Sequence, residues 1–571
     1  MTNRNIRRVV AAAAAGALLL VAAPTIAPAS AASGCAPGAT CEGTLKGALG
    51  TSTYKIQMPK KFNGTVLVYS HGYRIGTPIP AAIAVPLGFD KDPSYDKISF
   101  PAFQASLGSD VAYIGSGRAD ISPGDAVAQN LLGKGYALAG TGYAAQGWAT
   151  PEGVEANENL LKAIDNGAIK GVKKKLLWGS SLGGLIAATV AERNPDKVQG
   201  LLPTCGVLAG PEQAFGTAMT VLYTWKSLIA PTLKVANYTG YSEALGDLGT
   251  VLTTLQKVAA DSSLVSSVGF PVAQANFLSG LMGGLPSKSQ AFDGQTLNPV
   301  ATTQGTAAAL AGGYSFVSAG QSSAAAMLQN VGGAAALGIL GRYELEQRVR
   351  LTAGIPAGQN ANFSDNVNVS YSRLLSPEQR GEFGDTLNAT TVRENNLNAM
   401  IATLDSTKGN AAARFPANPK AVAAVRALPA PKGVYAVPTV LLHTEYDAIV
   451  PAGNSQWYYD RLTASAKKNA NARVAQYYTE PNPDGWTVYD AGAKGPNAAA
   501  STAAATSGVG HCNFAINGGV QLTNSVRALE LLVKGSSVKS ADKVMFKTAG
   551  VIPDAFFQPE PLKRPNLQPK R

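Results

Sequence analysis

The segment from Lys175 to Val190 restricts the possible folds more than any other part of the sequence. Residues 175–178, Lys-Leu-Leu-Trp, are an apolar run typical of a buried strand, and they enter a glycine-rich turn at 179–184. Apolar residues then recur with the spacing of a helix packed on a sheet, at Leu182, Leu185, Ile186 and Val190. A strand that turns tightly into a helix predicts one unit of a parallel α/β sheet.

The same alternation of strands and helices continues on both sides of this segment. Further apolar, β-branched runs predict strands at residues 65–69, 136–139, 198–203, 437–443 and 474–478. Helical spacing is found at residues 154–164 and at about 522–533. This order predicts an α/β fold with a mostly parallel sheet and helices on both faces.

The alternation stops between about residues 213 and 429, where Ala, Gly, Ser and Asn dominate and patches such as 270–285 have helical spacing. We therefore predict an α/β core built from both ends of the chain, residues 32–212 and 430–551, with a large, mainly helical cap inserted at 213–429. Residues 552–571 form a tail rich in Pro and Lys.

The first 31 residues have the pattern of a signal peptide. Arg4, Arg7 and Arg8 precede an uninterrupted small or apolar stretch, Val9–Ala23, and Ala29-Ser30-Ala31 supplies a cleavage site. Arg7-Arg8 leaves the twin-arginine export route open. The apolar stretch is short for a bilayer span and nothing later in the chain resembles it, so we expect a secreted, extracellular protein without stable membrane insertion.

The chain has four cysteines, Cys35, Cys41, Cys205 and Cys512. An even number of cysteines in an exported chain is typical of disulfides, which persist outside the cell. Cys35 and Cys41 are expected to close a small loop at the start of the mature chain. That leaves Cys205 with Cys512.

Ser181 is the candidate nucleophile, because Gly179-x-Ser181-x-Gly183 is the only G-x-S-x-G in the chain. In a sequence with 61 glycines the motif alone is weak, but here it follows an apolar strand and opens an amphipathic helix, the context that the motif requires. A serine hydroxyl is a poor nucleophile at neutral pH and needs a neighbouring base.

The base must be sought among only three histidines. His443 closes a predicted buried strand and is expected to be structural. His71 follows the strand at 65–69, ahead of the nucleophile in the chain. His511 lies in a loop after the last predicted strand of the core, and we assign the base role to it.

A histidine base needs a carboxylate that fixes its tautomer. Asp447, just past the strand that ends at His443, is the preferred acid, with Glu445 and Asp490 as rivals. The oxyanion that forms during acyl transfer needs N–H donors. The backbone amides of Leu182 and Tyr73 are the candidates.

His71-Gly72, the turn at 179–184, Asp447-Ala448-Ile449-Val450-Pro451 and Gly510-His511 together resemble the α/β-hydrolase superfamily, specifically its secreted bacterial serine esterases and peptidases. The resemblance covers about 45–210 and 434–545. It implies the triad Ser181, Asp447 and His511 in this chain order, with no cofactor and no metal.

A cysteine directly after the base histidine, as Cys512 follows His511, also resembles the pattern of the tannase and feruloyl-esterase group. In that group a disulfide joins the residue next to the catalytic serine to the residue next to the catalytic histidine. This sequence has Ser180 where that cysteine would stand. Cys205, at the end of the next strand, could pair with Cys512 instead and hold the His511 loop.

These observations predict a secreted carboxylic ester hydrolase that acts on a small-molecule or polymeric ester. The alternative is a secreted serine exopeptidase with the same triad, in which Glu344 or Glu346 of the cap would hold a free amino terminus. A binding protein that has lost catalysis is the third hypothesis. Lys173-Lys174-Lys175 is a short basic run without an aromatic-lined basic face beside it, which argues against nucleic-acid binding. The histidines and cysteines lack the spacing of metal ligands, which argues against a metal site.

Overall fold

The computed structural model describes residues 34–85, 89–260, 264–284, 334, 337–377, 379–380, 393–445, 447–467, 469–479, 489–490, 495–496, 511–512, 514, 519–548, 551–553 and 559–562. The predicted leader, residues 1–31, and most of the predicted tail lie outside the described residues.

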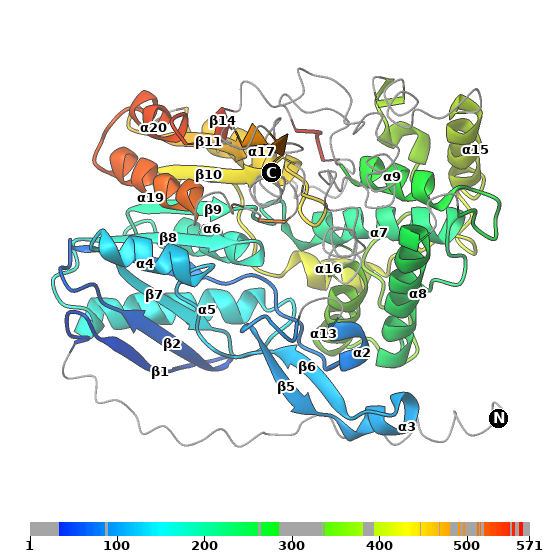
Figure 1. Cartoon of the computed structure of the whole chain (residues 1–571), viewed down its shortest axis with the longest axis horizontal. Coiled ribbons are helices and arrows are strands. Elements are labelled where there is room, and N and C mark those ends of the chain that lie inside the picture. The colour runs from blue at the N-terminus through cyan, green and yellow to red at the C-terminus, as the bar shows by residue number, and fades with distance from the viewer. Residues whose placement is uncertain are drawn as a thin grey trace.

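A nine-stranded sheet in the order β1-β2-β7-β3-β8-β9-β10-β11-β14 occupies the left side of the molecule in Figure 1. Its strands are β1 (Thr40–Gly47), β2 (Gly50–Gln57), β3 (Thr65–Ser70), β7 (Ala137–Gly142), β8 (Lys174–Ser180), β9 (Gly200–Thr204), β10 (Thr439–Thr444), β11 (Val474–Thr479) and β14 (Val551–Pro553). The six strands from β7 to β11 in this order are parallel, whereas β1, β2 and β14 pair antiparallel.

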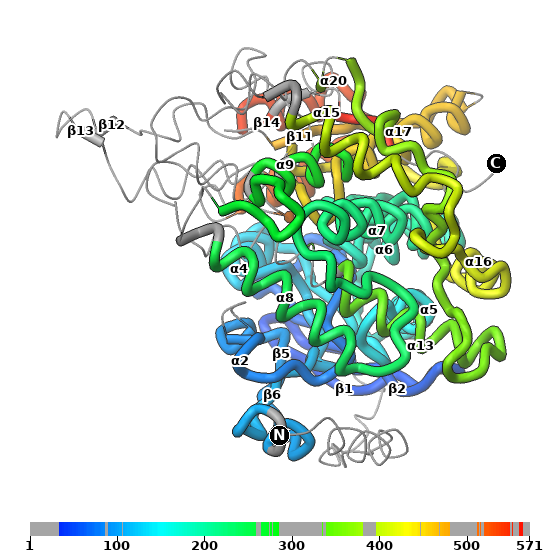
Figure 2. The backbone as a smooth tube through the Cα atoms, turned by 90° about the vertical axis from the view of Figure 1, so that its right-hand side faces the viewer, coloured from blue at the N-terminus to red at the C-terminus, as the bar shows by residue number. Residues whose placement is uncertain are grey.

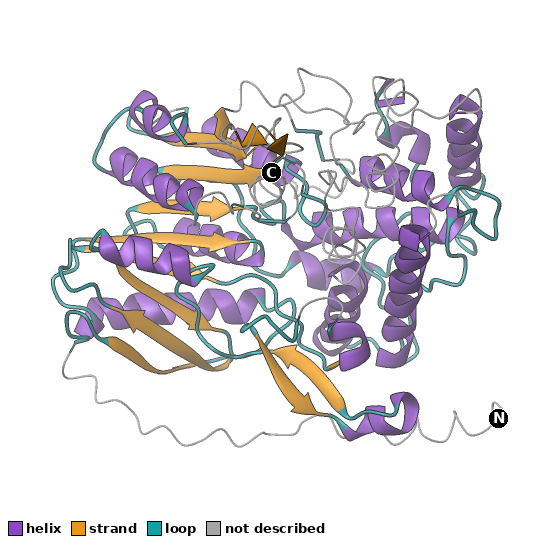
Figure 3. Cartoon of the chain, viewed as in Figure 1, coloured by secondary structure: helices purple, strands orange, loops and turns teal. Residues whose placement is uncertain are grey.

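Helices cover both faces of this sheet (Figure 3). They are α4 (Asp125–Gly133), α5 (Thr150–Ala163) with the π-helical turn η2 (Ile164–Ala168), α6 (Leu182–Arg193), α17 (Gly453–Ala466), α19 (Val520–Val533) and α20 (Val538–Met545). Val66 and Val68 of β3 pack with α5, α6 and α17, whereas Leu67 and Tyr69 pack with α4, α19 and α20. This alternation of side chains explains why the strand is apolar throughout.

Helices also make up most of the described chain between β9 and β10. They are α7 (Gly210–Leu228), α8 (Tyr241–Ala260), α9 (Val272–Gly283), η5 (Leu337–Gly341), α13 (Arg342–Ala353), η6 (Tyr371–Leu374), α15 (Arg393–Asp405) and α16 (Pro419–Arg426). In Figure 2 this group lies in front of the sheet, and it supplies most of an apolar cluster that also includes Ile75, Ile79 and Ala84. The boundaries 213 and 429 of a separate cap domain stay a prediction.

Several strands of the structure have no counterpart in the sequence analysis. A second sheet, β4-β6-β5, consists of β4 (Ile79–Pro80), β5 (Tyr95–Ser99) and β6 (Val111–Gly115), beside the short helices α2 (Ala81–Ala84), η1 (Pro101–Phe103) and α3 (Gln104–Leu107). Strands β12 (Tyr489–Asp490) and β13 (Gly495–Pro496) form a third.

The strand order, the parallel central strands and the tight β8–α6 turn are those of an α/β-hydrolase fold, so the predicted fold class is confirmed. All six predicted core strands are present. Within the described ranges, no helix combines the length and the apolar character needed to cross a bilayer.

Candidate active site

Ser181 lies in the turn between β8 and α6 with φ 59° and ψ −126°. A residue with a Cβ is strained at positive φ, and such strain is concentrated at functional sites. The flanking glycines explain how the turn closes: a Cβ on Gly179 would overlap the backbone of Gly183, and one on Gly183 would overlap the carbonyl group of Ser70. The G-x-S-x-G spacing is therefore required by close backbone packing.

Asp447 and His511 form a hydrogen-bonded pair. His511 Nδ1 lies 2.7 Å from Asp447 Oδ2, and Asp447 Oδ1 accepts the backbone amides of Ile449 at 2.9 Å and Val450 at 2.8 Å. The Asp447 side chain is fully buried, whereas the His511 side chain is 18% exposed. A carboxylate on Nδ1 keeps the proton there and leaves Nε2 unprotonated, the state that a general base requires.

Of the rival acids, Glu445 is buried at the end of β10, and its amide donates to the carbonyl oxygen of Thr479 at 3.0 Å. The side chain of Asp490 lies outside the described residues. The structure thus brings Asp447, and not Glu445, into hydrogen-bond contact with His511.

His443 is fully buried beneath this pair. Its Nε2 lies 2.8 Å from the carbonyl oxygen of Val450 and 3.7 Å from Asp447 Oδ2. Burial lowers the pKa of His443. A neutral ring that donates to a carbonyl group supports the loop that carries Asp447, which is a structural role.

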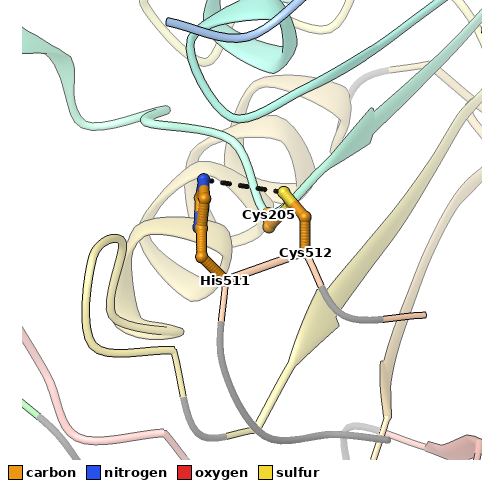
Figure 4. Close-up of side chains that lie close together, drawn as sticks. All are labelled: Cys205, His511 and Cys512. Atoms are coloured by element: carbon orange, nitrogen blue, oxygen red, sulfur yellow. Dashed lines mark hydrogen bonds between the residues drawn. A yellow bond between two sulfur atoms is a disulfide. The ribbon is translucent and has the colours of Figure 1, made fainter. Parts of the chain in front are cut away.

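The end of β9 links the Ser181 turn to His511, and Cys205, His511 and Cys512 lie together there (Figure 4). The amide of Ser181 donates to the carbonyl oxygen of Thr204 at 3.0 Å, and the next residue, Cys205, is disulfide-bonded to Cys512. His511 precedes Cys512, and its Nε2 lies 3.7 Å from Cys512 Sγ. Residues more than 300 positions apart in sequence are therefore joined beside the Ser181 turn.

The segment His71-Gly72-Tyr73 passes next to Ser181. A Cβ on Gly72 would lie 3.3 Å from the Ser181 Cβ. His71 stacks on the Tyr143 ring with centroids 3.8 Å apart, and the Tyr143 hydroxyl donates to the His71 carbonyl oxygen at 2.8 Å. Burial lowers the pKa of His71 well below its usual value, so this ring is neutral and serves to hold the segment.

The two predicted oxyanion donors come from adjoining segments. Leu182 is the first residue of α6, and the first amides of a helix have no acceptor within the helix. Tyr73 follows the glycine that approaches Ser181. The amino-terminal end of a helix also favours negative charge, which is where the oxyanion would form.

The two cap acids of the sequence analysis are not solvated surface charges. Glu344 lies in the first turn of α13 and accepts a hydrogen bond from the Tyr73 hydroxyl at 2.6 Å. Glu346 is fully buried and accepts the amides of Asn237 at 2.9 Å and Tyr238 at 2.7 Å. No pattern in the sequence predicts these contacts or the role of Tyr143, and only the glycine-rich turn around Tyr143 marks that region.

Both cysteine pairs lie within bonding geometry. Cys35 and Cys41 are joined with a Cα–Cα distance of 5.9 Å, and Cys205 and Cys512 with one of 5.5 Å. Cys205, His511 and Cys512 also place three possible metal-ligand atoms within 4.8 Å of one another. Metal ligation requires thiolates, however, and both of these sulfurs are in the disulfide.

Replacing Cys205 and Cys512 together with serine is expected to lower the free energy of unfolding by about 2–5 kcal/mol, because the bond closes a loop of 307 residues. Activity is expected to fall as well, since the bond holds the residue next to His511. Chemical denaturation and kcat on an ester would measure the two effects.

The matched control is the double replacement of Cys35 and Cys41, whose bond closes a loop with a sequence separation of 6. That variant is expected to keep its kcat. Equal loss of kcat in both variants would show that the Cys205–Cys512 bond has no particular link to His511.

No known family model matches the sequence, and neither does any curated protein. Among solved structures, similarity is found to an arylesterase, with 16% identity and a TM-score of 0.18 over 30% of this chain and 47% of that chain. The present chain thus spans about half the length of the arylesterase.

Two other structures are matched over more of the chain. Feruloyl esterase B from Aspergillus oryzae has 10% identity and a TM-score of 0.30, over 77% of this chain and 72% of its own. A Pyrobaculum calidifontis esterase has 9% identity and a TM-score of 0.29, over 90% of this chain and 87% of its own. Similarity at this level shows no shared activity. The strand order of the chain and its own β8–α6 turn identify the fold as that of the α/β-hydrolases.

Proposed function

We propose that this chain is a secreted serine hydrolase that cleaves carboxylic esters through an acyl-enzyme. The observation that carries the proposal is the Asp447–His511 hydrogen bond of 2.7 Å, held by a disulfide at the end of the strand next to the Ser181 turn. The disulfides are compatible with an oxidising compartment, as secretion requires.

In the proposed mechanism Ser181 Oγ attacks the ester carbonyl carbon while His511 Nε2 takes the hydroxyl proton. Asp447 remains ionised, holds the proton on Nδ1 and stabilises the imidazolium. The amides of Leu182 and Tyr73 donate to the oxyanion. As the intermediate collapses, the C–O bond to the alcohol breaks and His511 returns the proton to the leaving oxygen.

Water then hydrolyses the acyl-enzyme, and His511 and the two amides act again in the same roles. His511 Nε2 takes a proton from the water, the oxygen attacks the acyl carbonyl carbon, and the second tetrahedral intermediate again places its oxyanion at the two amides. Release of the carboxylic acid returns the proton to Ser181 Oγ. Apart from the ester and water, this cycle uses only side chains and backbone amides of the chain.

The contacts of the two cap acids favour an esterase over an exopeptidase. An aminopeptidase needs a carboxylate with unused acceptor capacity to bind a substrate ammonium group. Glu346 is buried against two amides and the Arg342 side chain, 3.9 Å away, and Glu344 already accepts hydrogen bonds from Tyr73, Gly76 and Thr77.

An active-site label and a substrate panel test this function together. A fluorophosphonate should modify one residue stoichiometrically, and peptide mass spectrometry should find the label on Ser181. Aryl esters of increasing acyl length should be hydrolysed with kcat/KM well above that for aminoacyl amides. Faster cleavage of the amides would favour the exopeptidase. Absence of both label and turnover would favour a binding protein.

A further inference from the structure

A single carboxylate of the cap is bonded to the segment that follows β3. Glu344 accepts hydrogen bonds from the Tyr73 hydroxyl at 2.6 Å, the Gly76 amide at 2.7 Å and the Thr77 hydroxyl at 3.0 Å. Gly147, at φ 83°, leaves room for this carboxylate, because a Cβ there would lie 2.6 Å from Glu344 Oε2. Helix α13 is thus joined to residues 73–77 across a sequence separation of about 270.

The core holds the same segment from its other side. Arg74 is 3% exposed and donates to the carbonyl oxygens of Ser116 at 2.6 Å and Arg118 at 2.7 Å, and it pairs with Asp120. The Gly147 amide donates to the Arg74 carbonyl oxygen at 2.7 Å. Residue 74 is therefore fixed to the core, whereas the Tyr73 side chain extends to the cap.

The environment of Glu344 makes its hydrogen bonds costly to lose. Burial raises the pKa of its carboxyl group to about 7, although the three donors act in the opposite direction. A poorly solvated carboxylate that loses a donor has little water to replace it. The contact therefore restricts where the Tyr73 side chain, and with it the adjoining backbone, can lie.

We propose that Glu344 is a positioning residue that sets the Tyr73 amide for oxyanion binding, so that the docked cap contributes to transition-state stabilisation. This inference rests on the proposed esterase function and on the assignment of Tyr73 as a donor. It follows from the joint placement of Gly72 against Ser181 and of the Tyr73 hydroxyl against Glu344.

The test compares Tyr73→Phe, Glu344→Gln and the double variant with wild type at pH 8 on one aryl ester. Tyr73→Phe keeps the ring and the backbone amide and removes only the hydroxyl. A displaced oxyanion donor should lower kcat by about 10- to 100-fold in either single variant. KM should change by less than about threefold, since ground-state binding is retained. The double variant should fall no further than the single ones.

Tyr241→Phe is the matched control. The Tyr241 hydroxyl of α8 also donates to the segment after β3, but to the carbonyl oxygen of Pro78 and not to Glu344. This variant should keep wild-type kcat. Circular dichroism and thermal melting establish that each variant is folded, and Tyr73→Phe provides the mildest change should Glu344→Gln fail to fold.

A trifluoromethyl ketone analogue of the substrate separates oxyanion binding from general structural damage. Ser181 Oγ adds to its carbonyl carbon, the carbonyl oxygen becomes the oxyanion, and His511 takes the hydroxyl proton. Its inhibition constant should rise by the same factor as kcat falls, whereas binding of the product alcohol should not change.

Wild-type kcat in both folded single variants, or a loss confined to KM, would overturn the inference and leave the esterase function intact. A loss in Tyr241→Phe equal to that in Tyr73→Phe would also overturn it. If the wild type neither turns over the ester nor accepts the fluorophosphonate, the proposed function fails and the inference fails with it.

Discussion

Replacing Ser181 with alanine is expected to lower kcat on esters by about 10⁶-fold, because loss of the nucleophile removes the whole acyl-enzyme route. The oxyanion donors and substrate binding would leave a small residual rate over the uncatalysed reaction. The fluorophosphonate should no longer label the protein. Prolonged steady-state assays with freshly purified variant measure the residual rate.

Replacing Ser181 with glycine tests in addition whether the backbone of the Ser181 turn is strained, because strain changes the free energy of unfolding. Glycine adopts a φ of 59° without steric cost, so it should relieve strain of about 1–3 kcal/mol. The glycine variant should therefore be inactive and more stable than the alanine variant in denaturant titrations. Equal stability would show that the turn is not strained.

Ser180→Ala is the neighbouring control. The Ser180 hydroxyl is hydrogen-bonded to the Thr204 hydroxyl at 2.8 Å, so its loss should cost about 1 kcal/mol of stability. Its kcat should remain near that of the wild type. Retained activity in Ser181→Ala, or a comparable loss in Ser180→Ala, would contradict the assignment of the nucleophile.

The sequence predicted the inner strands of the sheet because burial on both faces makes them apolar throughout. Strands β3, β8 and β10 are buried at nearly every position, and each is a continuous apolar run interrupted by few polar residues. Strand β1 alternates between exposed and half-exposed positions at the edge of the sheet. Its inner face carries only Cys41 and Leu45 between glycines, so the alternation is too weak to distinguish the strand from a loop in the sequence.

The Ser181 turn could be predicted because its chemistry is local: two glycines, one serine, and a strand and a helix on either side. The Glu344–Tyr73 contact could not, because no local pattern joins residues 271 positions apart. The sequence of α13 places Glu344 on a helix with charged neighbours, which is typical of a surface. Only the packing of α13 on the segment after β3 makes Glu344 a half-buried hydrogen-bond acceptor.

The sequence narrowed the carboxylate that orients His511 to Asp447, Glu445 and Asp490 but could not decide among them by spacing. Glu445 and Asp447 both follow β10 within three residues, and spacing alone does not tell which one reaches the histidine loop. The structure places Asp447 Oδ2 at 2.7 Å from His511 Nδ1 and gives its Oδ1 two amide donors. Asparagine at this position is therefore the sharpest probe of the pair.

Asp447→Asn is expected to lower kcat by about 10⁴-fold while the protein stays folded. The asparagine Oδ1 can keep the amides of Ile449 and Val450, which turns its NH₂ group toward His511 Nδ1. The ring must then accept at Nδ1 and carry its proton on Nε2. A protonated Nε2 cannot take the proton of Ser181, so the base is present in the wrong tautomer.

Glu445→Gln is the matched comparison, since this carboxyl group is equally buried and lies two residues away. It should reduce kcat far less than Asp447→Asn when both are measured on the same ester with thermal melting as a check of folding. A larger loss in Glu445→Gln would transfer the acid role to Glu445. Both variants leave the amides of Leu182 and Tyr73 untouched, so a fall in kcat in either one reports on the acid–base pair and not on the oxyanion donors.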